Sequence, residues 1–590
     1  MMRVSDNPRR RRIWLLSIGI ALVLLVAAGL WLATRVLVAK DGLEAAAATA
    51  SEIPGLIRSG DTGGAVEAAR SFESHIQSAR GATSDPIWRA AEWIPGIGSD
   101  LAAVRGMSDV AAELATDSVL PLAETLGSID IASFGFVDGR IDVTPLAAAA
   151  PVLATANGVM QKAVEQIGAL PTPSLPPVQS ALARFREIAA ESAAVVDGLD
   201  RAAAVLPAMV GADGPRTYLL LVLNNAEVRT YGGIAGAGAV LRFDDGRITI
   251  DRQFSSSDFK KSPTPVIDLS PGTIALFDDH PARFIQNTTS SFDFSEAAAS
   301  AAALWARQTG EEVDGVIALD AVTISAMLEA TGPVQAGPFT LDATNAVDTL
   351  LSTVYAQIID PSMQDEAFAL VARSVFETLA AGKADVGVLL SSLGRSVSEQ
   401  RVHVWSSHPE EEKRIAGTPL ATILPPDRDA ATVGVFFNDV TGAKLDYYAT
   451  PSTSVLVDSC GATPRATVTV DWTNTVPTDA ATSLPDYVIG PELTVAARGD
   501  TLTRVAVAGP TGWLPTDYSF DGGQIGVQSA QFDDRAVIQH EFVTAPGGSH
   551  RIVVEFRAPE GASHDEIPLE VVSTPLVHPN VVTITHETCA

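Results

Sequence analysis

Cysteine, histidine and aromatic residues are scarce in this chain of 590 residues, which has 2 cysteines, 9 histidines and 6% aromatic residues. Two distant cysteines cannot supply the ligands of a structural zinc site. The histidines are scattered, and the one close pair, His403 and His408, has no recognised ligand spacing, so we expect both to be solvated. Composition therefore gives no sign of a metal centre built on thiolates or imidazoles.

Common catalytic motifs are also absent from the sequence. It contains no Gly-x-Ser-x-Gly elbow, no Walker loop and no His-Glu-x-x-His, and the glycine-rich stretch 232–238 lacks the GxGxxG spacing. The sequence therefore lacks the usual signatures of serine hydrolases, nucleotide-driven enzymes and zinc proteases.

Basic residues are few, with 40 Lys and Arg against 70 Asp and Glu. Seven of the basic residues lie in the first 40 positions, so the remainder carries 33 basic and 69 acidic residues, a net charge of −36. So acidic a chain is not expected to bind nucleic acid or other anionic surfaces.

Long apolar runs are absent except for one at the N-terminus, residues 13–34, which has no charged residue and follows Arg9–Arg12. At about 1.5 Å per residue it is long enough to cross a lipid bilayer. The arginines predict a cytoplasmic tail at residues 1–12 and an extracytoplasmic bulk, as in a single-pass signal anchor. The alternative is a cleaved signal peptide, although such peptides have a shorter apolar core.

The predicted extracytoplasmic part of the chain is too long to fold around one hydrophobic core, and its composition changes twice along the sequence. Residues 41–210 are rich in alanine and predict a helical stalk or bundle, in which Trp88 and Trp93 anchor a turn. Residues 211–455 alternate strand and helix patterns and predict an α/β layered domain with a mixed sheet. Residues 456–590 predict a β-sandwich. The expected fold class is therefore α+β and multidomain.

The two cysteines lie at the ends of the last predicted domain. Because both are expected outside the membrane, in an oxidising compartment, we predict a disulfide between Cys460 and Cys589. Two unpaired thiols are the alternative.

The segment from Tyr218 to Phe259 is the part of the chain whose residues are least explained by packing. An apolar run at 217–223 predicts a buried strand, and 237–243 with 247–254 predict a hairpin joined at Asp244-Asp245-Gly246. Since ligand sites gather where neighbouring strands end, we expect the polar residues at these ends to face each other.

The polar and glycine residues at these strand ends are the candidate site: Asn224, Asn225, Glu227, Arg229, Gly232, Gly233, Ser257 and Asp258. Carboxylates with Asn and Arg suit a sugar or a metal-bridged phosphate. The alternative is that these side chains cap loops and pair with one another. Farther along, Asp320 stands between a strand at 315–320 and a helix at 321–330, where an N-cap belongs.

The strings NNAEVRTYGG, DDGRI, SSSDF, VDGVIALD and TGPV, over about residues 215–335, resemble the bacterial envelope family called domain of unknown function 4012. That family is distantly similar to the LytR-CpsA-Psr envelope phosphotransferases, which move glycopolymers from a polyprenyl pyrophosphate lipid with the help of arginines and a magnesium-binding aspartate. The resemblance implies catalytic roles for Glu227, Arg229 and Asp258, with Asp258 also as a ligand of Mg²⁺. It implies ligand-binding roles for Asn224, Asn225, Gly232, Gly233 and Asp320. Ser257-Asp258 stands where those enzymes have an Arg-Asp pair.

The expected function is that of a membrane-anchored protein of the bacterial cell envelope that binds or transfers a polyprenyl-pyrophosphate-linked glycopolymer. Its partners would be the bilayer, through residues 13–34, and a cell-wall polymer or polyprenyl lipid. The alternative is a non-catalytic scaffold or adhesion component. Transfer requires Glu227, Arg229 and Asp258 to converge on one concave pocket.

Overall fold

The computed structural model describes residues 8–58, 61–127, 136–137, 140–358, 361–427, 430–461, 463–491, 493–524, 526–562 and 568–587. Mixed helix and sheet is the composition predicted from the sequence. The chain divides into two compact units, the first from residues 1–134 with 142–207 and the second from residues 135–141 with 208–590.

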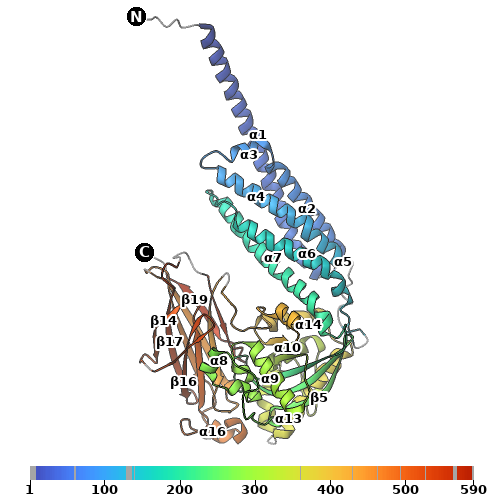
Figure 1. The fold of residues 1–590 in the computed structure, drawn as a ribbon, viewed down its shortest axis with the longest axis vertical. Coiled ribbons are helices and arrows are strands. Elements are labelled where there is room, and N and C mark those ends of the chain that lie inside the picture. The colour runs from blue at the N-terminus through green and yellow to red at the C-terminus, as the bar shows by residue number, and fades with distance from the viewer. Residues whose placement is uncertain are drawn as a thin grey trace. The chain divides into compact units, whose positions relative to one another are not determined.

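The first unit begins with the long helix α1 (Pro8–Arg58), of 51 residues. Its stretch Leu16–Ile53 is, by length and composition, able to cross a membrane. The apolar run predicted at 13–34 and the start of the helical stalk predicted from residue 41 belong to this one helix, which is continuous through residues 35–42. Figure 1 shows α1 extending beyond the other helices of its unit.

The other helices of the first unit form a bundle. They are α2 (Thr62–Thr83), α3 (Pro86–Ala91), α4 (Gly98–Leu114), the π-helical turn η1 (Ala115–Val119), α5 (Leu120–Gly127), α6 (Thr144–Gly168) and α7 (Pro176–Met209). In this bundle α2 packs along the C-terminal half of α1, α4 and α5 pack on α2, and α6 packs on α4 and α5. Small residues let the helices approach closely: a Cβ added at Gly42 would lie 3.2 Å from Cβ of Ala79.

The two tryptophans at the turn between α3 and α4 differ in burial. Trp88 is 1% exposed, and its Nε1 donates to the carbonyl of Leu101 at 3.0 Å, so it anchors the turn as predicted. The same prediction for Trp93 is wrong, since its side chain is 89% exposed. The turn is closed instead by Trp88 and by the backbone bond from Gly98 N to Ile94 O at 2.9 Å.

The second unit contains a mixed seven-stranded sheet in the order β1-β2-β5-β4-β3-β6-β9. Its strands are β1 (Phe136–Val137), β2 (Arg140–Ile141), β3 (Arg216–Asn224), β4 (Ile234–Asp244), β5 (Arg247–Ser255), β6 (Gly315–Asp320) and β9 (Val402–Ser406). The pair β3–β6 is parallel and the other pairs are antiparallel. Strands β1 and β2 lie within residues predicted to be helical stalk, which is a correction to that boundary.

The strands predicted around the candidate site, β3 to β6, are confirmed to within a few residues. The β4–β5 turn has positive φ at both central residues, 49° at Asp245 and 74° at Gly246, the geometry of a type I′ hairpin turn. The local sequence therefore sets the β4–β5 register, and the ends of β3 and β5 lie at the same edge of the sheet with the start of β4 between them.

Helical segments follow the strands of this unit. They are η3 (Ser256–Asp258), α8 (Pro271–Phe277), η4 (His280–Ala282), η5 (Ile285–Ser290), α9 (Phe294–Thr309), α10 (Ala321–Thr331), α11 (Ala346–Asp348), the π-helical η6 (Thr349–Thr353), α12 (Val354–Gln357), α13 (Pro361–Ala380), α14 (Val386–Ser398), α15 (Pro409–Ile415), η7 (Asp446–Tyr448), α16 (Ala480–Ser483) and α17 (Asp486–Ile489). The short hairpin β7 (Val334–Ala336) and β8 (Phe339–Leu341) follows α10.

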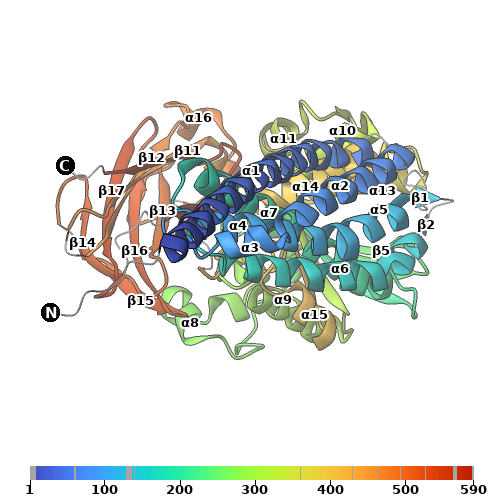
Figure 2. The same ribbon diagram turned by 90° about the horizontal axis from the view of Figure 1, so that it is seen from above.

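Two further sheets of five strands each, in the orders β15-β16-β13-β10-β18 and β14-β17-β12-β11-β19, share one apolar core. The strands are β10 (Ala431–Asp439), β11 (Ala449–Asp458), β12 (Arg465–Asn474), β13 (Thr501–Ala508), β14 (Leu514–Phe520), β15 (Gln528–Phe532), β16 (Arg535–Thr544), β17 (Ser549–Arg557), β18 (Leu569–Ser573) and β19 (Val581–His586). Figure 2 shows them as two layers.

These paired sheets begin earlier than the predicted boundary at 455/456, because β10 and most of β11 precede it. Every residue of β10 is buried, so its pattern does not distinguish a strand of the central sheet from one of the later sheets. Aromatic contacts join the two parts, with the Phe292 ring 4.5 Å from Phe436 and 5.3 Å from Phe532. The seven-stranded sheet and the paired sheets thus share packed side chains.

The predicted disulfide involves Cys589, which lies outside the described residues. Cys460 follows β11, and its Sγ lies 3.8 Å from the carbonyl oxygen of Glu587. The parallel pairing of β11 with β19 brings the end of the chain to this point. The bridge stays a prediction.

Candidate functional site

A cavity of about 320 Å³ lies beside β3, β4 and β5 in the second unit, and we call it the β3–β5 cavity. Residues from the sheet and from α10, η6, α12, α13 and α17 line it: Leu220, Val222, Leu223, Asn224, Glu227, Ile234, Gly236–Ala239, Gln253–Ser257, Gln286, Ala321, Ile324, Leu350, Leu351, Tyr355, Gln364, Val371, Ala372, Lys444 and Tyr487. Most of these side chains are apolar, and the polar ones include a charged pair.

The charged pair in the wall of the β3–β5 cavity is Lys444 with Glu227, whose Nζ and Oε1 are in direct contact. Both side chains are nearly buried, at 4% and 11% exposure. The ammonium also lies 5.1 Å from the ring centre of Tyr355 and 4.7 Å from that of Tyr487, within cation–π range. Lys444 is therefore held by a carboxylate and two aromatic faces.

The protonation states of this wall follow from its burial. Burial alone would lower the pKa of Lys444, but the adjacent Glu227 carboxylate outweighs it and the pKa is raised. Burial raises the pKa of Tyr355, so its hydroxyl stays neutral and can serve as a hydrogen-bond group. It accepts from Nδ2 of Asn224 at 2.8 Å. This part of the cavity wall thus presents an ion pair and a neutral hydroxyl.

Arg229 lies apart from Glu227, in the wall of a second cavity of about 280 Å³ shared with Asn287, Asp439 and Arg504. Its Nε and Nη2 donate to Oδ1 of Asn287 at 3.3 and 3.1 Å, and its Nη1 donates to the Val228 carbonyl at 2.8 Å. The guanidinium thereby fixes the loop after β3 to η5. The buried Asp439 carboxyl has a raised pKa because of desolvation, which the charge of Arg229 partly offsets.

Asp258 lines neither cavity and is exposed. Its Oδ2 accepts from the Ser255 backbone at 2.8 Å, completing a capping box at η3. Among the described residues, no group of three or more His, Cys, Asp or Glu side chains is placed to hold a metal ion. The Mg²⁺ site that the family resemblance implies at Asp258 stays a prediction.

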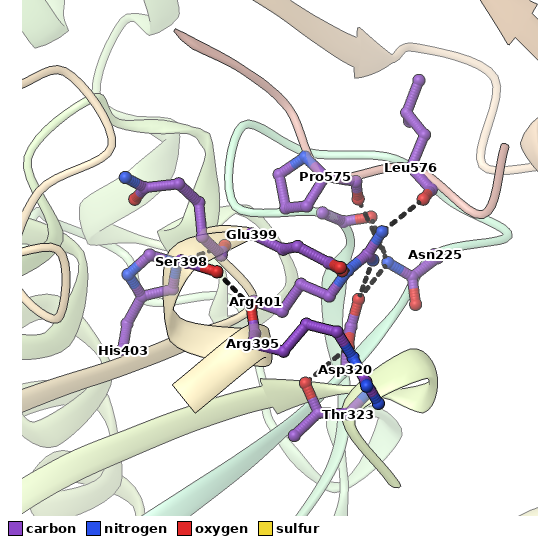
Figure 3. A network of polar contacts seen from close by, with 12 residues as sticks. Asn225, Asp320, Thr323, Arg395, Ser398, Glu399, Arg401, His403, Pro575 and Leu576 are labelled. Atoms are coloured by element: carbon purple, nitrogen blue, oxygen red, sulfur yellow. Dashed lines mark hydrogen bonds and ion pairs between the residues drawn. The ribbon is translucent and has the colours of Figure 1, made fainter. Parts of the chain in front are cut away.

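Asn225 and Asp320 are fully buried in a polar network (Figure 3). Asn225 Nδ2 donates to Oδ2 of Asp320 at 3.0 Å, to the Gly232 carbonyl at 3.2 Å and to the Pro575 carbonyl at 3.4 Å. These partners account for the amide nitrogen without any ligand. Asn225 therefore joins the loop after β3 to the segment between β18 and β19.

Asp320 caps α10 as its position predicted, accepting from the backbone N and the Oγ1 of Thr323 at 2.8 and 2.9 Å. Its second oxygen pairs with Arg401 at 2.7 Å, and Arg401 also donates to the Leu576 carbonyl at 2.9 Å. Sequence reasoning missed Arg401, because it is 81 residues from Asp320 and belongs to no motif. With both oxygens of Asp320 occupied and the residue buried, the geometry favours a structural role.

Gly232 and Gly233 are explained by close backbone packing. Gly232 has φ of 102°, and a Cβ there would lie 3.0 Å from the Pro575 carbonyl oxygen. A Cβ at Gly233 would lie 2.2 Å from the Asn224 carbonyl oxygen. Side chains are excluded at both positions by the chain itself.

The two histidines predicted to be solvated are both engaged. His403 is fully buried against the rings of Tyr231 and Phe294, with centroids 4.6 and 5.1 Å away, and its Nε2 lies 2.8 Å from the Gln400 carbonyl. Burial lowers the pKa of His403 to about 4. His408 Nε2 lies 2.9 Å from Oδ1 of Asp314. The sequence pattern missed both because their partners come from other elements.

Strands β3 to β6 and the loop after β3 lie within a segment that matches a known family. Residues 213–355 match the family described as "Protein of unknown function (DUF4012)". The resemblance seen in the sequence over about 215–335 is therefore confirmed for this segment. No curated protein and no solved structure matches the chain at a significant level.

The DUF4012 segment supplies only part of the candidate site. It contributes β3 to β6, α10 and Tyr355, whereas Lys444 and Tyr487 come from beyond its end. The three residues predicted to be catalytic do not line a common cavity: Glu227 lines the β3–β5 cavity, Arg229 the second cavity, and Asp258 neither.

Proposed function

We propose that this protein is anchored in the bacterial cell membrane and that its second unit binds one end of a polyprenyl-linked envelope ligand without transferring it. The observation that supports binding is the β3–β5 cavity, whose lining is mostly apolar and includes Lys444, Glu227 and the Tyr355 hydroxyl. An amphiphile with an apolar chain and a hydrogen-bonding head group matches such a cavity.

The anchoring part of the proposal is supported by α1. Its apolar stretch is long enough to cross a bilayer, and the arginines at positions 9–12 favour a cytoplasmic tail under the positive-inside rule. The second unit would then lie outside the cell membrane, where lipid-linked glycopolymers are assembled.

Binding rather than transfer is supported by where the predicted catalytic groups lie. Glu227 is neutralised by Lys444, Arg229 is bound to Asn287, and Asp258 caps η3. A transferase would need these groups on one reacting centre. The volume, about 320 Å³, is at the lower end for ligand cavities, so it suits one end of a long lipid rather than the whole molecule.

The test is a cavity-filling variant, Gly236→Leu, in the full chain. Gly236 lines the β3–β5 cavity, and the nearest atom to a Cβ added there, Cβ of Asn224, is 3.5 Å away, an ordinary contact. The matched control is Gly394→Leu on α14, where an added Cβ meets nothing within 4 Å. Equilibrium binding of a fluorescent polyprenyl phosphate should weaken at least about tenfold for Gly236→Leu, a cost of about 1.4 kcal/mol, and stay unchanged for Gly394→Leu.

Two further arms of the same assay separate the alternatives. Arg229→Ala should leave binding of the probe unchanged, because Arg229 lines the second cavity. Weaker binding by this variant would show that Arg229 contributes to the ligand site. Affinity that requires Mg²⁺ would favour the metal-assisted phosphotransferase hypothesis. If Gly236→Leu binds the probe as wild type does, or if neither protein binds it, the proposal fails and the scaffold or adhesion alternative is favoured.

A further inference from the structure

The turn between α3 and α4 in the first unit exposes a group of apolar side chains. Trp93 is 89% exposed, Ile94 48% and Ile97 40%, and the sequence Trp-Ile-Pro-Gly-Ile contains no charge. We call residues 93–97 the apex loop. Single exposed apolar residues are common on proteins, but a tryptophan and two isoleucines within five residues form a patch.

Contacts within the unit show which part of α1 lies beside the apex loop. Along the antiparallel pair of α1 and α2, Gly42 lies against Ala79, and Arg35 then pairs with Asp85 at 3.5 Å. Moving from α2 into α3 therefore means moving along α1 toward its apolar N-terminal half. Asp85 caps α3 and also accepts from Nε1 of Trp31 at 3.0 Å.

The apex loop comes directly after α3, which has six residues and so spans about 9 Å. Whatever its direction, the loop lies within about two helical turns of the level of Arg35 on α1. That level is where the uncharged run of residues 13–34 ends. Figure 1 shows α3 beside α1 at the point where α1 leaves the other helices.

A second connection ends at the same place. The backbone nitrogens of Ser174 and Leu175, between α6 and α7, donate to Oδ1 of Asp100 at 2.8 and 2.9 Å, at the start of α4. Leu175 is 48% exposed. Two loops from different parts of the sequence thus present apolar side chains at the end of the bundle where the apolar half of α1 emerges.

We propose that the apex loop, with Leu175 beside it, inserts into the interfacial layer of the bilayer that α1 crosses. Tryptophan concentrates at this depth, because its ring is apolar and its N–H can bond at the head groups, and Trp31 on α1 lies at the same level. The proposal rests on the membrane anchoring by α1 that is part of the proposed function. A second contact beside the span fixes the tilt of the first unit on the membrane surface.

The experiment uses the full chain in lipid vesicles and the fluorescence of Trp93, obtained as the difference between wild type and Trp93→Phe. Lipids brominated near the head-group end of the acyl chain should quench the Trp93 signal more than lipids brominated near the methyl end. Its emission should shift to shorter wavelength on reconstitution, and aqueous acrylamide should quench it weakly.

The matched control is Val195→Trp in the Trp93→Phe background. Val195 is 64% exposed on α7, about 30 Å along the helix from Leu175, so the introduced indole should be quenched by acrylamide and not by brominated lipid. The protein is first shown to be membrane-bound by its flotation with the vesicles. If Trp93 is then quenched by acrylamide and not by brominated lipid, as the control is, the apex-loop proposal is overturned while the anchor stands. Trp93 shielded from both quenchers would mean that protein covers the loop, which also overturns it. A chain that does not float with vesicles overturns the anchor and this inference together.

Discussion

Replacing Asp320 by Asn should destabilise the seven-stranded sheet, because the change removes one charge from a buried ion pair. Asp320 is 0% exposed and Arg401 4% exposed, so the guanidinium would remain buried without its partner. Breaking a buried pair in this way costs about 3–5 kcal/mol. Arg401 keeps its contact with Glu399, which is 46% exposed, so we expect the lower end, about 3 kcal/mol.

Comparing Asn with Ala at the same position separates the two roles of Asp320. Asn can still cap α10 through the Thr323 backbone, whereas Ala cannot, and loss of a cap costs about 1 kcal/mol. Asp320→Ala should therefore lose about 4 kcal/mol in total. A ligand-binding role would instead predict weaker probe binding with little change in stability.

The assay is hydrogen exchange of backbone amides in β3 and β6, read by mass spectrometry, which reports opening of this sheet without contributions from the helical unit. Glu329→Gln is the matched control: Glu329 is also on α10 but pairs with Arg395 at the surface, with 40% and 48% exposure, so its cost should stay below about 1 kcal/mol. If Asp320→Asn falls within about 0.5 kcal/mol of wild type, the pair does not stabilise the sheet and the reasoning is refuted.

Three other predictions concern the second unit. Burial lowers the pKa of His403 to about 4, whereas an unfolded histidine has a pKa of about 6.5. As pH falls from about 6.5 to about 4, the unfolded chain therefore binds a proton that the folded chain does not. Over this range wild type should lose up to about 3 kcal/mol of folding stability relative to His403→Phe. Burial raises the pKa of Asp446, which has the opposite effect on stability, but this effect is the same in both proteins and cancels in their difference. Stability is measured by urea titration at each pH, and equal dependence on pH in the two proteins would contradict the prediction. The isolated segment 213–355 should not give the dispersed amide spectrum of a folded domain, since Arg401 and Pro575 lie outside it; a folded fragment would show that these contacts are dispensable. Mass measurement without reduction should show two hydrogens fewer than after reduction, with Cys460→Ser abolishing the difference; unchanged mass would mean free thiols.

Local patterns predicted the elements around the candidate site well. An apolar run gave β3, Asp-Asp-Gly gave the β4–β5 turn with positive φ, and Asp320 was placed correctly as a helix cap. Each of these depends on residues that are neighbours in sequence. The same kind of argument located the apolar part of α1.

Pairing across the fold was beyond such reasoning. Glu227 and Arg229 were grouped because they lie two residues apart in the loop after β3, yet Glu227 pairs with Lys444, 217 residues later, and Arg229 with Asn287. Trp93 was predicted to anchor a turn together with Trp88, yet its side chain is exposed. Charge and motif indicate that polar side chains have partners, but only the packed fold determines which partners those are.

The position of the final strands has a consequence for how the protein is made. Asn225 reaches the Pro575 carbonyl across 350 residues, and β18 and β19 add the last strands to both paired sheets in parallel register. If the chain crosses the membrane from the anchor onward, as a signal anchor with a cytoplasmic N-terminus requires, the loop after β3 can make this contact only after nearly the whole chain has crossed. Contacts of such sequence separation form slowly. Biogenesis should therefore include an exported but incompletely closed intermediate, and nonsense mutations near the C-terminus should affect the protein as severely as changes in its central sheet.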